Sequence, residues 1–370
     1  MKRRALISLS LFLLVYSGLV IYIGWNGWVW LQSVFQLENG LIYTAAITLA
    51  AFSYFISRVS SLSIFRIIGA YWLGIFQYAL LLIPLANLAY AILSLFPLDQ
   101  QMLLFSLGLI VITAVIAMIA YGSFQAYSPV IRPYQLHIAK KAENHKSLRI
   151  AVASDMHFGT LSGKAHARRL VSLIHQINPD LILLPGDIVD DDPDVFKKKK
   201  MGEELSRLNA PLGVYAVLGN HEYYGKKIPE FIEEMAECGV TVLLDETVEV
   251  DGSFYLLGRK DRTDHTRASV AELTQSLDQS KPVLMLDHQP YELEKAEKAG
   301  VDLLLSGHTH RGQLAPNHLF TKRLFEIDWG YHRRKTLHTI VSSGFGFWGP
   351  PLRIGSRSEI VQIDLTFESS

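Results

Sequence analysis

The chain has 370 residues, of which 49% are hydrophobic and 19% are charged, so its overall composition fits both a soluble protein and a membrane protein. Lys and Arg number 35, as do Asp and Glu, and this zero formal charge argues against a nucleic-acid partner. The single cysteine, Cys238, excludes an intramolecular disulfide and a cysteine-rich zinc site. Any bound metal ion would therefore need nitrogen and oxygen ligands.

The first third of the chain is almost free of charged residues. Four apolar runs occur there, at residues 5–24, 41–57, 67–93 and 102–121. A helix of about 20 apolar residues crosses the hydrocarbon core of a bilayer. Trp25, Trp28 and Trp30 follow the first run and are typical of interfacial anchors, whereas the small-residue cleavage pattern of a signal peptide is missing. We therefore predict a transmembrane region of four helices over residues 1–122.

Basic residues lie in alternate links between these runs. They are Lys2, Arg3 and Arg4 before the first run, Arg58 and Arg66 between the second and third, and Arg132, Lys140, Lys141 and Lys146 after the fourth. Links rich in Lys and Arg face the cytoplasm. Four crossings would return the chain to its starting side, so we expect a multi-pass protein of the cell membrane whose C-terminal domain is cytoplasmic.

Residues 123–147 contain Pro129, Pro133 and several Lys, and we predict a linker there and a second domain over residues 148–370. That second region alternates short apolar runs with helix-like stretches. The predicted strands are 149–154, 180–185, 213–218, 240–244, 253–257, 282–286, 301–306 and 336–342, and the predicted helices include 164–176, 229–237 and 291–299. This alternation predicts an α/β domain.

Polar residues that can bind metals follow five of the predicted strands. In chain order they are Asp155 and His157, then Asp187 and Asp190, then Asn220, His221 and Glu222, then His288, and finally His308 and His310. Because the carboxyl ends of parallel strands converge on one edge of a sheet, we expect these side chains to share a pocket. Gly186, Gly219 and Gly307 precede three of the clusters, where a missing Cβ allows a close approach of the backbone.

The ordered blocks Asp155-Met156-His157, Gly186-Asp187-Ile188-Val189-Asp190, Gly219-Asn220-His221-Glu222, His288 and Gly307-His308-Thr309-His310 resemble the signature of the calcineurin-like metallophosphoesterases. The end of the chain, from Ser342 to Gly346, from Pro350 to Arg353 and at Glu359-Ile360, resembles a membrane-associated bacterial branch similar to the UDP-2,3-diacylglucosamine pyrophosphatases and their uncharacterised relatives. The resemblance implies two facing mixed β-sheets flanked by helices, with two metal ions at the sheet edge.

Carried over to this chain, the resemblance implies one metal ion bound by Asp155, His157, Asp187 and His310, and a second bound by Asp187, Asn220, His288 and His308. His221 would protonate the leaving group, and Asp190 would orient it through a hydrogen bond. The ligand types suit Mn, Fe, Zn or Mg and do not choose among them. No substrate-binding residue is identified. Phosphoprotein phosphatases have Arg-Gly where Asp191-Asp192 stands here, which argues against protein phosphatase activity.

The favoured function is a membrane-bound phosphoesterase that hydrolyses phosphodiester, phosphomonoester or pyrophosphate bonds with two divalent ions. The membrane region favours a lipid-linked substrate, with membrane lipids as further partners. One alternative is a phosphodiesterase for soluble nucleotides or cyclic nucleotides. A second alternative is a non-catalytic membrane sensor or transporter, although binding alone would not need an acid such as His221.

Overall fold

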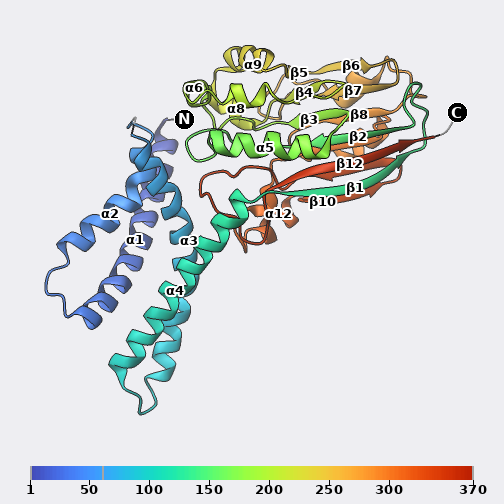
Figure 1. The fold of residues 1–370 in the computed structure, drawn as a ribbon. Coiled ribbons are helices and arrows are strands. Elements are labelled where there is room, and N and C mark those ends of the chain that lie inside the picture. The colour runs from blue at the N-terminus through green and yellow to red at the C-terminus, as the bar shows by residue number, and fades with distance from the viewer. Residues whose placement is uncertain (1, 61, 369–370) are drawn as a thin grey trace. The chain divides into compact units, whose positions relative to one another are not determined.

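The computed structural model describes residues 2–60 and 62–368, and the side chains of residues 2–6, which include the basic Lys2, Arg3 and Arg4, lie outside the described part. The chain divides into two compact units, Met1–Gly122 and Ser123–Ser370 (Figure 1).

Within its described residues, the regular secondary structure of the first unit consists of helices joined by short links, and the last helix continues to Tyr127. Its helices are α1 (Lys2–Phe35), α2 (Leu41–Ile56), α3 (Ser63–Leu93) and α4 (Gln100–Tyr127). Three segments are long and apolar enough to cross a membrane: Ile7–Phe35, Ser63–Leu93 and Gln100–Tyr127, with hydropathies of 2.1, 1.7 and 2.8. Helix α2 has 16 residues. At about 1.5 Å per residue it is shorter than a hydrocarbon core of about 30 Å. The described residues thus contain four apolar helices, of which three have the length of a span.

Buried polar groups join these helices. The Tyr16 hydroxyl donates to the Ala51 carbonyl oxygen at 2.7 Å, and Trp72 Nε1 donates to the Tyr16 hydroxyl at 2.9 Å. These bonds link α1, α2 and α3 around an apolar cluster that includes Val20. In a medium without water, such internal hydrogen bonds satisfy polar groups that would otherwise be costly to bury.

The second unit contains two six-stranded mixed sheets. The first has the order β1 (Val130–Ile138), β12 (Glu359–Phe367), β2 (Ser147–Val152), β3 (Leu181–Pro185), β4 (Val214–Val217) and β5 (Thr241–Val242). The second has the order β10 (Gly330–Arg334), β11 (Leu337–Val341), β9 (Leu303–Ser306), β8 (Val283–Leu286), β7 (Phe254–Gly258) and β6 (Glu246–Val250). Strands β2 to β5 are mutually parallel, and so are β11, β9, β8 and β7.

The sheets face each other across an apolar core. Ile150 and Val152 of the first sheet share one buried cluster with Leu284 and Leu303 of the second. Side chains alternate between the two faces of a strand, so Ala151 instead belongs to a second cluster, under the helices. The helices are α5 (Lys164–Ile177), α6 (Pro193–Lys198), α7 (Gly202–Leu205), α8 (Asn220–Gly225), α9 (Ile228–Glu237), α10 (Val270–Thr274), α11 (Leu293–Lys298), the 3-10 helix η1 (His310–Gly312) and α12 (His318–Leu324).

The predicted α/β class with two mixed sheets is confirmed, and the eight predicted strands occur with shifted ends. Four further strands, β1, β6, β10 and β12, were not predicted. Strand β1 lies inside residues 123–147, which the sequence indicated as a linker, and pairs in parallel with β12, from Val130↔Glu359 to Ile138↔Phe367. It carries Pro133 and is an edge strand, where a residue without a backbone N–H is tolerated.

Candidate metal centre

All seven predicted metal ligands lie directly after strands of the two sheets. Asp155 and His157 follow β2, and Asp187 follows β3. Asn220 opens α8 after β4, His288 follows β8, and His308 and His310 follow β9. These five strands run parallel within their sheets, so their carboxyl ends deliver the seven side chains to one place.

Asp155, His157 and His310 form a first group, whose potential ligand atoms lie within 4.8 Å of one another. The Nε2 atoms of His157 and His310 are 3.1 Å apart, and His310 Nε2 is 3.5 Å from Asp155 Oδ1. The three side chains are at most 11% exposed. Such a buried set of imidazole and carboxylate groups has the composition of a metal site.

Asp187, His288 and His308 form a second group of the same kind. His288 Nε2 lies 3.1 Å from Asp187 Oδ2 and 3.2 Å from Asn220 Oδ1. Asp187 Oδ2 is also 3.7 Å from His157 Nε2 of the first group. Asp187 therefore lies between the two groups, and one carboxylate contacts members of both.

Burial sets the charge of this centre. Burial lowers the pKa of His157 to about 3 and that of His308 to about 4, so both rings are neutral and can offer a lone pair. Burial also raises the pKa of Asp155 to about 6. Although burial opposes it, the Asp187 carboxylate raises the pKa of His288 well above its usual range, so a proton on His288 supplies part of the positive charge that these buried carboxylates need. Divalent cations would supply that charge, and the oxygen and nitrogen donors fit Mn, Fe, Zn or Mg.

The backbone is in an unusual conformation at the candidate ligands. Positive φ angles occur at Asp155 (53°), His157 (44°), Asp187 (53°), His308 (72°) and His310 (48°). Non-glycine residues rarely adopt this region, and such strain concentrates at functional sites. The preceding glycines allow close packing, since a Cβ on Gly219 would lie 2.1 Å from Asp187 Oδ1 and one on Gly307 would lie 2.2 Å from Asp155 Oδ2.

Glu222, for which no role is predicted from the sequence, connects two of these turns. Its buried carboxylate accepts hydrogen bonds from the backbone N–H groups of Gly219 at 2.7 Å, Asp187 at 3.1 Å and Val189 at 3.0 Å. The turn after β3 is thereby fixed against the turn after β4. The backbone N–H of His221 adds a second contact between the two turns, since it donates to Asp187 Oδ1 at 2.9 Å.

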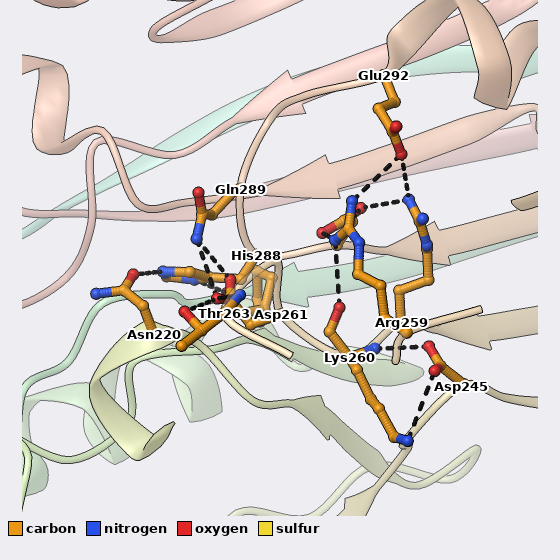
Figure 2. Close-up of polar contacts among 12 residues, drawn as sticks. Asn220, Asp245, Arg259, Lys260, Asp261, Thr263, His288, Gln289 and Glu292 are labelled. Atoms are coloured by element: carbon orange, nitrogen blue, oxygen red, sulfur yellow. Dashed lines mark hydrogen bonds and ion pairs between the residues drawn. The ribbon is translucent and has the colours of Figure 1, made fainter. Parts of the chain in front are cut away.

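The loop that carries His288 is fixed by buried ion pairs (Figure 2). Asp287 is fully buried and accepts from Arg259 Nη1 at 3.0 Å, and Arg267 approaches the same carboxylate at 3.3 Å. On the other side of His288, Gln289 Nε2 donates to both carboxylate oxygens of Asp261, at 3.0 and 2.8 Å. Residues on both sides of His288 are therefore anchored to the loop after β7.

The sequence predicts Asp190 as the partner of His221, and the structure adds the neighbouring Asp191. The structure records the hydrogen bond between His221 Nδ1 and Asp191 Oδ1, at 2.6 Å, one residue beyond the predicted Asp190. Asp190 lies in the same cluster, with its ligand atom within 4.8 Å of those of Asp191 and His221. Asp191 has a φ of 59°, and this turn, which the sequence does not reveal, brings the second carboxylate to the imidazole. Although burial opposes it, the hydrogen bond with Asp191 raises the pKa of His221 to about 9.

Two aromatic side chains flank His221 at the rim of the centre. The ring centroid of His221 is 5.6 Å from that of Tyr224 and 6.3 Å from that of Trp348. Tyr224 is 58% exposed and Trp348 is 50% exposed, whereas the neighbouring Phe345 and Phe347 are buried. The side of the centre at which His221 lies therefore offers an accessible aromatic surface.

Comparison with known proteins agrees with this geometry. The calcineurin-like phosphoesterase family matches residues 148–312, the part of the chain that contains the seven candidate ligands and His221. A transmembrane protein with metallophosphoesterase domain from Danio rerio is 30% identical over 273 residues, or 69% of this chain and 61% of the relative. An uncharacterised metallophosphoesterase from Helicobacter pylori is 35% identical over 226 residues, or 60% of each protein. One from Aquifex aeolicus is 31% identical over 254 residues, or 66% of this chain and 95% of the relative.

The chain belongs to the calcineurin-like phosphoesterase family. It spans about three fifths of the length of the zebrafish and Helicobacter relatives, at 61% and 60%. The relatives come from animals as well as bacteria, so membership of the family does not assign the chain to a bacterial branch.

Proposed function

We propose that this chain is a membrane-bound phosphoesterase that hydrolyses phosphodiester, phosphomonoester or pyrophosphate bonds with two divalent metal ions. The observation that carries the proposal is the position of Asp187 between the two groups of ligands. Asp155, His157, Asp187 and His310 would hold one ion, and Asp187, Asn220, His288 and His308 would hold the other. Bound ions would supply Lewis acidity toward the phosphoryl oxygens and lower the pKa of the attacking water.

His221 would protonate the leaving group in this reaction. Its backbone N–H donates to Asp187, which places the ring beside the centre, and Asp191 favours the protonated imidazole. Proton donation to a poor leaving group accelerates such reactions by about 10²–10⁴-fold. A sensor that only binds its ligand would have no use for this acid, so His221 favours an enzyme over the non-catalytic alternative.

Two substrate classes remain, and different observations support them. Three helices of membrane-spanning length favour a lipid-linked substrate, as does the resemblance of the C-terminal segment to UDP-2,3-diacylglucosamine pyrophosphatases. The exposed rings of Tyr224 and Trp348 beside His221 could instead stack on the base of a soluble nucleotide or cyclic nucleotide. We favour the lipid-linked class because the chain has far more apolar helix than a tether requires.

The full chain purified in detergent is expected to hydrolyse bis(p-nitrophenyl) phosphate when Mn²⁺ is added, and to lose at least about 100-fold of that rate on chelation. Lipid pyrophosphates in mixed micelles should then be hydrolysed with a higher kcat/KM than nucleoside diphosphates or cyclic nucleotides. The opposite ranking would support the nucleotide alternative. Absence of turnover with Mn, Fe, Zn and Mg would contradict the enzyme and favour a sensor.

The pattern of basic links supports a multi-pass arrangement with the catalytic domain in the cytoplasm. This arrangement requires α2 to cross the membrane together with the three longer helices, and a crossing of 16 residues would need local thinning of the bilayer. Green fluorescent protein fused to the C-terminus should fluoresce, and alkaline phosphatase fused there should be inactive. The reverse result would mean an odd number of crossings, with α2 lying outside the hydrocarbon core.

A further inference from the structure

Helix α12 presents an unusual apolar surface on the second unit. Leu319 is 61% exposed, Phe320 is 67% exposed and Leu324 is 69% exposed, and the helix has no buried residue. Among residues 128–368, all of which are described, the other exposed large hydrophobic side chains are the single residues Tyr224, Tyr331 and Trp348. Isolated exposed apolar residues are ordinary, but three within one short helix indicate an interaction surface.

The same helix carries basic residues and no acidic ones. Lys322 and Arg323 are exposed, and the sequence HLFTKRL contains neither Asp nor Glu. Thr321 faces the domain, since its hydroxyl donates to Asp328 Oδ2 at 2.7 Å. At about 100° per residue, Leu319, Phe320 and Leu324 fall within an arc of about 140° that also contains Arg323, whose long side chain can reach past them to the headgroups. Exposed apolar side chains together with Lys and Arg on one helix are typical of helices that lie in the interface of an anionic bilayer.

Helix α12 is joined directly to the metal centre. It begins beside η1, where a Cβ on Gly312 would lie only 2.4 Å from the backbone nitrogen of His318. At its other end the ring of Phe325 lies 6.0 Å from that of the candidate ligand His308. A surface that contacts α12 is therefore close to the site of the reaction.

A bilayer is the partner that the rest of the chain makes available. Three helices have the length of a membrane span, and the last of them, α4, ends at Tyr127. Only Ser128 and Pro129 separate it from β1, which limits the second unit to a short reach from the membrane. A soluble protein partner would have to compete with a lipid surface that is always present.

We propose that α12 docks into the headgroup layer of an anionic bilayer, with Leu319, Phe320 and Leu324 at the acyl boundary and Lys322 and Arg323 on lipid phosphates. This contact would present the metal centre to phosphate esters that lie in the membrane surface. The docking itself is independent of the proposed function, whereas its effect on catalysis rests on it.

The docking is tested with the full chain in vesicles of phosphatidylglycerol and phosphatidylethanolamine. Single cysteines replace Phe320 or Leu324 in a Cys238→Ser background and carry an environment-sensitive fluorophore, and exposed Gln275, directly after α10, is the control position. We expect a blue-shifted emission at positions 320 and 324 that nitroxide lipids quench, and neither effect at position 275. Emission at positions 320 and 324 like that at position 275 would overturn the proposal. A blue shift without lipid quenching would also overturn it and would point to a second protein copy.

A kinetic experiment tests whether docking of α12 affects catalysis. The double variant Leu319→Ser, Phe320→Ser should lower kcat/KM about tenfold toward an ester presented in vesicles and leave the rate on bis(p-nitrophenyl) phosphate within about twofold. The pair Lys322→Gln, Arg323→Gln should lose the preference for anionic over zwitterionic vesicles. Equal loss on both substrates would contradict docking. If the unaltered chain hydrolyses neither substrate, the proposed function fails, while the fluorescence result still decides whether α12 enters the membrane.

Discussion

Replacing Asp187 with asparagine should lower kcat on an aryl phosphodiester by more than about 10³-fold, a loss of about 4 kcal/mol in transition-state stabilisation. Asp187 is 2% exposed, and its Oδ2 lies 3.1 Å from His288 and 3.7 Å from His157. A carboxylate in that position can hold two cations and offset their mutual repulsion. The amide of asparagine keeps the shape but not the charge, so at least one ion should be lost.

Two measurements separate loss of metal from loss of fold. Elemental analysis should give two metal ions per chain for the unaltered protein and one or fewer for the Asp187→Asn variant. Added Mn²⁺ should stabilise the unaltered protein against unfolding by about 2.7 kcal/mol at 100 times the Kd, which is measured as a rise in melting temperature. The melting temperature of the variant should rise much less.

Asp180 provides a matched control because it precedes the same strand, β3, at the opposite end. Its carboxylate accepts a hydrogen bond from the Arg149 N–H at 2.7 Å. The Asp180→Asn variant should lose about 1 kcal/mol of stability and retain its metal and activity. Full metal content and full turnover in Asp187→Asn would contradict the bridging role.

The convergence of the seven candidate ligands could be predicted because each follows a short apolar run that is recognisable from its own residues. Asp155, Asp187 and His288, for example, come directly after β2, β3 and β8. The order of the strands need not be known, since any parallel arrangement brings these ends to one edge. The side-chain contacts were harder to predict. The hydrogen bond to His221 depends on the left-handed backbone of Asp191, which no sequence pattern signals.

The strands that were not predicted depend on distant partners. Strand β1 contains Arg132, Pro133 and His137, which lower its local preference for a strand, and it forms by pairing with β12, more than 200 residues later. The docking surface on α12 was missed for a related reason. Its seven residues are too few to show a helical period, and exposure of Leu319, Phe320 and Leu324 is known only once the fold places them outside the core.

The second large effect is expected at His221, and it should depend on the leaving group. His221→Asn should lower kcat/KM by about 10²–10³-fold on an alkyl phosphodiester, whose alkoxide needs a proton as it departs. On bis(p-nitrophenyl) phosphate, which releases a stable phenolate, the loss should be less than about tenfold. Equal losses on both substrates would mean that His221 serves to position the substrate or the metals and is not an acid.

The two neighbouring carboxylates can be distinguished by the pH dependence of the same reaction. Despite its burial, His221 has a pKa raised to about 9 by the hydrogen bond with Asp191 and by the charges of Asp187, Asp191 and Asp190. The acid acts only when protonated, so the activity on an alkyl ester should fall as the pH rises through this pKa. Asp191→Asn removes the charge that holds the proton, lowers the pKa, and should therefore shift the alkaline limb of kcat/KM to lower pH by about one unit.

Asp190→Asn removes a charge but not the recorded hydrogen bond, so its alkaline limb should move less than that of Asp191→Asn. Bound cations would lower the pKa of His221 in the unaltered protein and in both variants. The informative quantity is therefore the difference in pH between the alkaline limbs of Asp191→Asn and Asp190→Asn. A larger shift of the alkaline limb in Asp190→Asn would show that Asp190, the residue predicted from the sequence, orients His221. The expected order would instead show that the turn at Asp191 selects which of two adjacent carboxylates keeps the leaving-group acid protonated.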